Sequence, residues 1–224
     1  PKYRPRAIVW FYPVLFLGGP VFLFADDIAQ DFDDLFGCFG HCECGSVNFF
    51  ERVLQFVKPG VMEYEIEAEF MHEFLRRGSR GFAYTPIIGS GFNACVLHYI
   101  ENSAECKAGD VLLMDVGAED GNYASDMTRC LPVSGRFTDR QRKVYDAVLS
   151  VMRDAMKLLR PGVSLHEYHK EVGELMTAQL LGLGLIDKHD VDKQNPAWPA
   201  YKKYFMHGTS HFIGLDVHDV GLWH

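Results

Sequence analysis

Hydrophobic positions along most of the chain follow the periods of helices and strands. Ile66, Phe70 and Phe74 recur every four residues, which predicts an amphipathic helix that ends near Gly78. The apolar run 111–116 is nearly continuous, which is typical of a buried strand. The two patterns indicate a domain that mixes helices with buried strands.

Two further helices are marked by their first residues. Thr138 with Gln141, and Ser164 with Glu167, have the spacing of a capping box, in which two side chains satisfy the first backbone N–H groups of a helix. Apolar residues recur behind each box at helical spacing. Helices and strands joined by short loops predict an α+β fold, with helices packed over an antiparallel sheet.

A short pattern occurs twice in the chain. Segments 58–61 and 160–163 both consist of a basic residue followed by Pro, Gly and Val, and both lead into an amphipathic helix. Two related α/β halves would explain this echo.

Residues 1–50 do not resemble the rest of the chain. Basic residues precede an uncharged apolar run, 7–25, which two aspartates close, as in a signal peptide or a short membrane span. Pro13 and the Gly-Gly-Pro at 18–20 would break a spanning helix. We therefore expect two buried strands joined by a turn rather than a membrane segment.

Charge and cysteine content narrow the class of protein. The chain has 30 acidic and 22 basic residues, so it lacks the basic stripe of a nucleic-acid surface. Cys38, His41, Cys42 and Cys44 cluster, but their spacing fits no standard zinc finger, which favours a structural role. Reduced thiols in a cytoplasmic protein are expected.

Two aspartates give the strongest chemical signal. Asp115 ends the apolar strand, and Asp120-Gly121 is a favoured two-residue hairpin turn that would place Asp126 directly opposite Asp115. Their Cβ atoms would then be about 5 Å apart, and the like charges would repel. One aspartate could stay protonated, a basic residue could pair with both, or a divalent cation could lie between them. A cation is favoured, because the nearby Arg129 would point to the other face of the strand.

Three histidines give a second signal. His207, His211 and His218 lie close together in a Gly-rich apolar segment. A surface loop with histidines is the alternative to a metal site. Ligation by carboxylates and imidazoles together suits Mn, Co, Fe or Zn better than Ca or Mg.

Four segments resemble the signature segments of the pita-bread metallopeptidases, most closely the aminopeptidase P branch. They are Asp-Val-Gly at 115–117, Ser-Asp-Met-Thr-Arg at 125–129, the histidine segment 207–221, and 93–102, which contains His98. The resemblance implies a pita-bread fold, with helices over a curved antiparallel sheet. It covers 51–224 as a partial catalytic domain and leaves 1–50 as an unassigned segment that does not match the family.

The resemblance also implies a site and a reaction. Asp115 would chelate one divalent cation, Asp126 would bridge two, and His211 would hold the other, with Mn expected and Co, Zn or Fe as alternatives. Hydroxide between the cations would attack the bond before a proline at the second position of a peptide. Cytoplasmic location and a homo-oligomer are expected. Three further histidines would position the peptide and stabilise its developing charge: His98, His207 and His218.

The chain departs from this family toward its C-terminus. The family completes its site with two later glutamates, whereas no glutamate follows Glu174 here. We therefore expect a fold that is incomplete at the C-terminus, and a 224-residue chain that is unstable and inactive when made alone. A proline dipeptidase and a non-catalytic pita-bread binding protein are the alternative functions.

Overall fold

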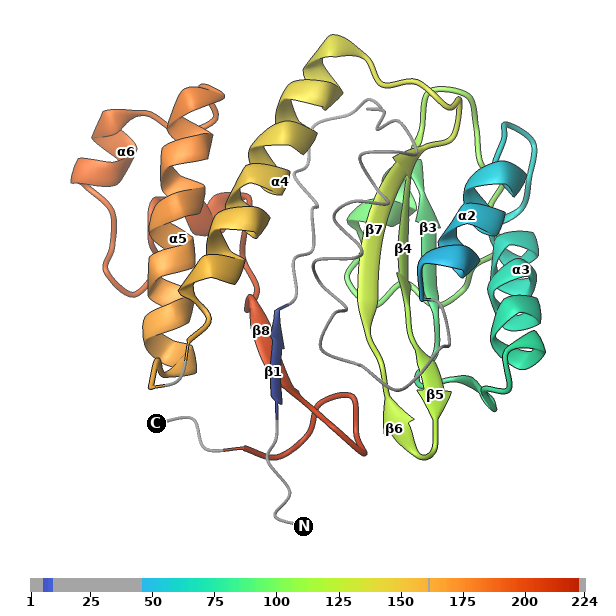
Figure 1. Ribbon diagram of the computed structural model, residues 1–224. Coiled ribbons are helices and arrows are strands. Elements are labelled where there is room, and N and C mark those ends of the chain that lie inside the picture. The colour runs from blue at the N-terminus through green and yellow to red at the C-terminus, as the bar shows by residue number, and fades with distance from the viewer. Residues whose placement is uncertain (1–5, 10–45, 161, 222–224) are drawn as a thin grey trace. The chain divides into compact units, whose positions relative to one another are not determined.

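The computed structural model describes residues 6–9, 46–160 and 162–221 (Figure 1). The chain divides into two compact units. The sheet unit comprises Gly18–Gln141, and the helical unit comprises Pro1–Leu17 with Arg142–His224. Each unit has its own buried core, and each is described by itself.

The described residues of the sheet unit form two α-helices and two antiparallel sheets of three strands each, ordered β3-β4-β7 and β2-β5-β6. The predicted buried strand is β4, and the predicted helix is α3, so both expectations are confirmed. The elements are α2 (Ser46–Phe56), α3 (Glu63–Arg76), β2 (Gly81–Phe82), β3 (Ile87–Ser90), the short helix η1 (Gly91–Cys95), β4 (Val111–Val116), β5 (Ala118–Asp120), β6 (Tyr123–Ala124) and β7 (Met127–Pro132).

Aromatic side chains join the helices of the sheet unit to its sheets. Phe70 of α3 is fully buried and meets the ring of Phe50 from α2 edge-on, with centroids 5.2 Å apart. Phe74 packs in the same way against Phe82 of β2, at 5.1 Å. Each fully buried ring contributes about 1.5–3 kcal/mol through removal from water. This core fixes α3 beside the strands that carry the candidate site (Figure 1).

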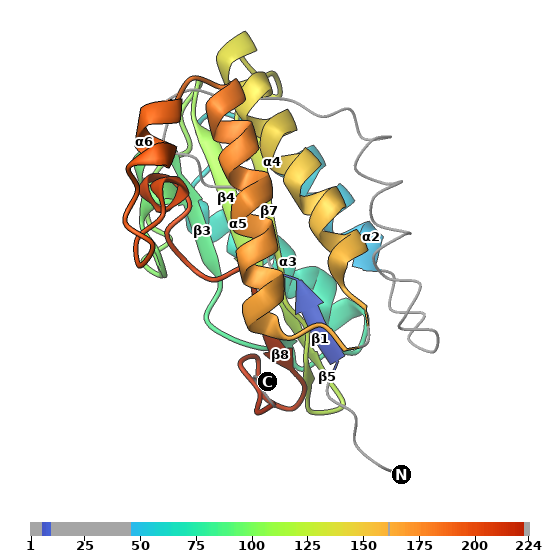
Figure 2. The same ribbon diagram turned by 90° about the vertical axis from the view of Figure 1, so that its left-hand side faces the viewer.

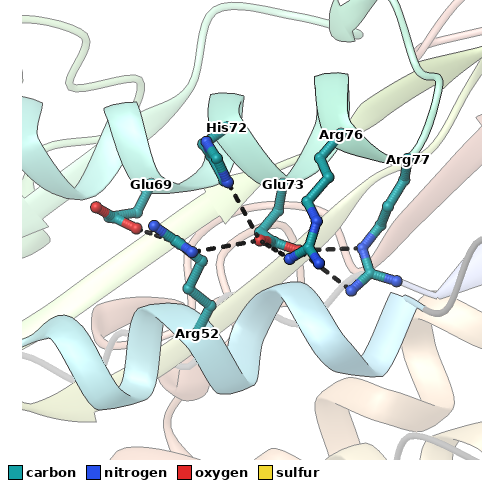
Figure 3. Close-up of polar contacts among 6 residues, drawn as sticks. All are labelled: Arg52, Glu69, His72, Glu73, Arg76 and Arg77. Atoms are coloured by element: carbon teal, nitrogen blue, oxygen red, sulfur yellow. Dashed lines mark hydrogen bonds and ion pairs between the residues drawn. The ribbon is translucent and has the colours of Figure 1, made fainter.

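An ion-pair cluster also joins α2 to α3 (Figure 3). The buried carboxylate of Glu73 accepts hydrogen bonds from Nε and Nη2 of Arg77, at 3.2 and 3.1 Å. Arg52 of α2 and Arg76 each place a guanidinium nitrogen 3.6 Å from its other oxygen. Burial alone would raise the pKa of Glu73, but the hydrogen bonds and positive charges of these arginines outweigh it and lower the pKa.

Where the structure describes it, the helical unit consists of helices and a two-stranded ribbon. Helices α4 and α5 pack together through Val151 and Ala155 on one side and Tyr168, Val172 and Met176 on the other (Figure 2). Strand β1 pairs antiparallel with β8. The elements are most of α4 (Asp139–Leu158), α5 (Leu165–Gly182), α6 (Lys188–Asp192), the short helix η2 (Ala200–Lys203), β8 (Ser210–Ile213) and β1 (Arg6–Val9).

Both predicted capping boxes are present. The Gln141 side chain accepts from the Thr138 N–H at 2.8 Å, and the Gln141 N–H donates to the Thr138 hydroxyl at 3.5 Å. Ser164 and Glu167 make the same reciprocal pair at the start of α5. Local side-chain chemistry therefore sets the beginnings of α4 and α5.

The repeated segments 58–61 and 160–163 share a hydrogen bond and a glycine conformation. In each, the fourth residue donates its N–H to the carbonyl of the first at 3.3 Å. Gly60 and Gly162 both have φ of 94°, a conformation that glycine adopts at little cost. A helix follows each segment, and the relation between two halves stays a prediction.

Several expectations for the first fifty residues fall outside the described part of the chain. Only β1 is described within the apolar run 7–25. The cluster of Cys38, His41, Cys42 and Cys44 lies outside the described residues. Among the helices that are described, none is both long and apolar enough to cross a membrane.

Candidate metal centre

Asp115 and Asp126 converge on one hydroxyl group. Asp115 lies in β4, the central strand of its sheet, and is 2% exposed. Asp126 directly precedes β7. The Tyr84 hydroxyl is 2.6 Å from Oδ1 of Asp115 and 2.5 Å from Oδ1 of Asp126. The two carboxylates therefore face the same place.

The predicted register of this hairpin is wrong. Asp115 pairs with Thr128, not with Asp126. The two turn residues are Gly121 and Asn122, one position later than expected, and their φ values of 58° and 71° are those of a type I′ turn. The partner of each residue thus shifts by two positions. Because side chains alternate with a period of two, Asp126 stays on the same face as Asp115, as a diagonal neighbour.

Contacts within and beyond the hairpin favour the observed turn. Asn122 donates its N–H to the Glu119 carboxylate at 2.6 Å, and its side-chain oxygen accepts from Arg80 at 3.1 Å. Asparagine also tolerates positive φ better than most residues. Arg80 lies 42 residues before Asn122, so the preference of Asp-Gly for a two-residue turn contains no information on this contact.

Tyr84 is the site residue that sequence reasoning missed. Burial raises the pKa of its hydroxyl well above 10, and the negative charges of Asp115 and Asp126 raise the pKa further. Tyr84 therefore stays protonated and acts as a donor. It lies between β2 and β3, outside any periodic pattern that could have marked it.

Gly117 makes room for this tyrosine. A Cβ atom at position 117 would lie 1.9 Å from the carbonyl oxygen of Ser125 and 2.8 Å from Cε1 of the Tyr84 ring. Both distances are too short for any other side chain. The glycine of the Asp-Val-Gly segment thus allows the close approach that brings Tyr84 to the carboxylates.

The histidine segment lies in the helical unit. His211 is in β8, and its ring stacks on that of His218 with centroids 4.1 Å apart. Nδ1 of His211 lies 2.9 Å from the Phe212 carbonyl oxygen, which can only accept, so Nδ1 carries the proton. Nε2 is then the nitrogen whose lone pair a metal would use. His207 orients in the same way, with Nδ1 3.1 Å from the Gly208 carbonyl.

A histidine of α5 holds this segment in place. Nδ1 of His169 accepts the Thr209 N–H at 3.2 Å and lies 3.0 Å from the Thr209 hydroxyl. Thr209 is 1% exposed. Burial lowers the pKa of His169, and the charges of Lys202, His207 and His166 lower it further, which favours the neutral form that can accept.

His98 lies on an exposed loop of the sheet unit. It is the third residue of a turn in which the Tyr99 N–H donates to the Val96 carbonyl at 3.3 Å. Its φ is 56°, a conformation that costs a non-glycine residue about 1–2 kcal/mol.

Comparison with known proteins identifies the family. The model of metallopeptidase family M24 matches residues 45–224. The chain belongs to metallopeptidase family M24. An Xaa-Pro aminopeptidase of Escherichia coli is 46% identical over 172 residues, which are 77% of this chain and 38% of that protein. Human Xaa-Pro aminopeptidase 3 is 38% identical over 162 residues, which are 72% of this chain and 31% of that protein.

Solved structures of M24 enzymes share the fold. The low-pH form of Escherichia coli aminopeptidase P matches with a TM-score of 0.74 at 44% identity, over 82% of this chain and 40% of that one. A variant of the same enzyme in complex with substrate matches with a TM-score of 0.72, over 78% and 39%. The predicted pita-bread α+β fold is confirmed. The chain spans about two fifths or less of the length of these relatives.

The carboxylate pair suits the divalent cations of an M24 enzyme. Thr128 lies opposite Asp115, and its Oγ1 is buried without a hydrogen-bond partner among the described residues. A buried polar atom of this kind is normally satisfied by a protein group, water or an ion. Two carboxylates beside such a hydroxyl form an oxygen-rich site that suits a hard or borderline divalent cation.

The expected ligand and catalytic residues of the M24 site are divided between the two units. Asp115, Asp126 and His98 belong to the sheet unit, whereas the histidine segment belongs to the helical unit. Within the part of the chain that the structure describes, no three His, Cys, Asp or Glu side chains gather closely enough to hold a metal ion. The joint ligand set of Asp115, Asp126 and His211 therefore stays a prediction.

Proposed function

We propose that the full-length protein is a metal-dependent Xaa-Pro aminopeptidase, which removes the N-terminal residue from peptides with proline at the second position. The observation that carries this proposal is the convergence of Asp115 and Asp126 on the Tyr84 hydroxyl in a chain of the M24 family. The relatives from Escherichia coli and Haemophilus influenzae, both Xaa-Pro aminopeptidases, favour this substrate over the dipeptides of a proline dipeptidase.

The proposed metal ligands are Asp115 for one cation, Asp126 as a bridge, and His211 for the other. The protonated Nδ1 of His211 supports ligation through Nε2, because its hydrogen bond to a carbonyl fixes the tautomer that a ligand requires. Two bound divalent cations would polarise the peptide carbonyl and lower the pKa of water. We propose Mn²⁺, with Co, Zn or Fe as alternatives; a zinc-substituted aminopeptidase P from Escherichia coli has been solved with product.

The proposed substrate-positioning residues are His98, His207 and His218. An imidazole N–H can donate to a peptide carbonyl oxygen and stabilise the charge that develops there. Burial lowers the pKa of His207, although its hydrogen bond to Gly208 raises it slightly, so the ring favours the neutral form.

We further propose that the protein is cytoplasmic and forms a homo-oligomer. Residues 51–224 would be part of the catalytic domain, and residues 1–50 would lie outside it. The 224-residue chain alone is expected to be inactive, because Asp115, Asp126 and His211 are too few ligands to hold two cations tightly.

The test uses the full-length gene product, freed of metal and then supplied with Mn²⁺. A tripeptide of the Xaa-Pro-Yaa type should release its first residue, whereas Xaa-Ala-Yaa and the dipeptide Xaa-Pro should be cleaved much more slowly. Asp126→Asn should abolish release, because an amide cannot bridge two cations as a carboxylate does. Cleavage without metal, or equal cleavage of the alanine peptide, would contradict the proposal.

A further inference from the structure

Glu63 is a buried carboxylate that the proposed reaction does not use. It lies at the start of α3, is 0% exposed, and accepts two hydrogen bonds on each oxygen. The donors are the Ser90 N–H (2.7 Å) and Asn93 Nδ2 (3.2 Å) on Oε1, and the Tyr99 hydroxyl (2.7 Å) and the Ala104 N–H (2.8 Å) on Oε2.

All four donors lie on one segment, residues 90–104, which we name the His98 segment. They are found at both of its ends and next to His98 itself. The Glu63 N–H also donates to the Ala104 carbonyl at 2.9 Å, which closes a reciprocal pair with Ala104. His98 keeps a φ of 56° within this segment. A strained backbone persists only where its surroundings hold it in place.

We propose that Glu63 is a positioning residue, which holds the His98 segment so that the His98 imidazole is presented in one conformation. This inference rests on the proposed function, in which His98 donates to the peptide carbonyl oxygen. Asn102 also holds this segment, because its side chain accepts the Ile88 N–H at 2.9 Å and donates to the Pro86 carbonyl at 2.9 Å and to the Glu67 carboxylate at 2.8 Å.

The four contacts require a carboxylate rather than an amide. The backbone N–H groups of Ser90 and Ala104 can only donate, and each faces a different oxygen of Glu63. In either orientation, a glutamine at this position would turn its NH2 group against one of them. Glu63→Gln therefore keeps the shape of the side chain but leaves buried donors unsatisfied.

The first measurement is hydrogen exchange of the His98 segment in the full-length gene product. Glu63→Gln should raise the exchange rate of the Ser90 amide or of the Ala104 amide at least about tenfold, because whichever of these N–H groups faces the NH2 group loses its acceptor. Glu65→Gln is the matched control. Glu65 lies in the same first turn of α3, is exposed, and accepts the Met62 N–H at 2.8 Å, a bond that glutamine can also accept. Equal exchange in the two variants would overturn the proposal.

The second measurement separates positioning from general stability. Glu63→Gln should lower kcat and kcat/KM together by about 10- to 100-fold, as expected when a catalytic group is misplaced. In a His98→Ala background the same change should cause no further loss. Additive losses would show a merely structural role and overturn the proposal.

Two outcomes need separate treatment. If the unaltered protein does not cleave Xaa-Pro peptides, the proposed function fails, and the exchange measurement alone decides whether Glu63 holds the segment. If Glu63→Gln does not fold, Tyr99→Phe replaces it, because this change removes a single one of the four donors. The segment is then held less tightly although the acceptors remain, so exchange of the Ser90 and Ala104 amides should rise by a smaller factor; unchanged exchange of these two amides would again overturn the proposal.

Discussion

Tyr84→Phe tests the centre of the candidate site. The change removes one oxygen atom and leaves the ring in the space beside Gly117. Asp115 and Asp126 then lose their shared donor, so each carboxylate can rotate away from the arrangement that a cation needs. We expect the full-length gene product to bind Mn²⁺ more weakly.

The size of the effect follows from the two contacts. Oxygen–oxygen distances of 2.6 and 2.5 Å are typical of hydrogen bonds to a charged acceptor. Such a bond contributes about 1.5–3 kcal/mol, but one hydroxyl carries one proton, so only one full bond is counted. This range corresponds to a factor of about 10–100, which is also the usual effect of losing a group that orients metal ligands.

Isothermal titration of the metal-free protein with Mn²⁺ measures this directly. Tyr123→Phe is the control, because Tyr123 is 52% exposed and lies at the end of the β5–β6 hairpin. Circular dichroism should show that both variants remain folded. The reasoning is refuted if Tyr84→Phe binds Mn²⁺ as tightly as Tyr123→Phe.

Three further predictions concern the surroundings of the site. Gly117→Ala should lower the free energy of unfolding by about 3 kcal/mol or more and weaken Mn²⁺ binding, because the new Cβ clashes with backbone. Glu73→Gln should lower it by about 1.5–3 kcal/mol in urea at neutral pH, through the lost charge-assisted bonds from Arg77. Because the pKa of Glu73 is lowered, this difference should be complete above about pH 4.5 and shrink as the pH falls through the folded-state pKa. The pKa of His169 is also lowered, so the stability from its bonds to Thr209 should be complete above about pH 6.5 and decline on acidification. His169→Gln should reduce this decline in thermal unfolding, because its side-chain oxygen accepts without titrating.

Each of these predictions has a matched control. Gly182→Ala should cause no loss, since nothing lies within 4 Å of its Cβ position. Glu51→Gln, at an exposed position of α2, and His189→Gln, at an exposed position of α6, should leave the pH dependence of stability unchanged. If a control variant shows the same change as the variant it is paired with, the effect does not come from the contacts described, and the prediction is wrong.

Sequence patterns predicted those elements whose causes are local. Strand β4 is nearly continuous in apolar residues because both of its faces are buried, and its predicted bounds agree with the structure. Helices α4 and α5 begin where Thr138 and Ser164 cap them. In both cases the deciding interaction lies within a few residues of the signal.

The site depends on contacts that no local pattern contains. The hairpin turn is contacted by Arg80 through Asn122, and the donor between the aspartates comes from Tyr84. Neither residue has a spacing that links it to its partner. The metal ligands themselves were predicted from like charges and from family resemblance, and their joint action is still to be tested.

The error in register did not affect the prediction of a shared site, for a geometric reason. A shift of one residue would have turned Asp126 to the opposite face, whereas a shift of two preserves the face and only lengthens the separation from Asp115. Both Oδ1 atoms lie within 2.6 Å of the Tyr84 oxygen and are therefore at most about 5 Å apart, and two ionised carboxylates at that distance repel by about 3 kcal/mol at an effective dielectric constant of about 20. Tyr84 holds them together but is neutral, so it leaves the net charge of the pair unchanged. Binding a divalent cation would remove that repulsion, and a carboxylate pair held in advance by a hydroxyl loses less freedom when the cation arrives.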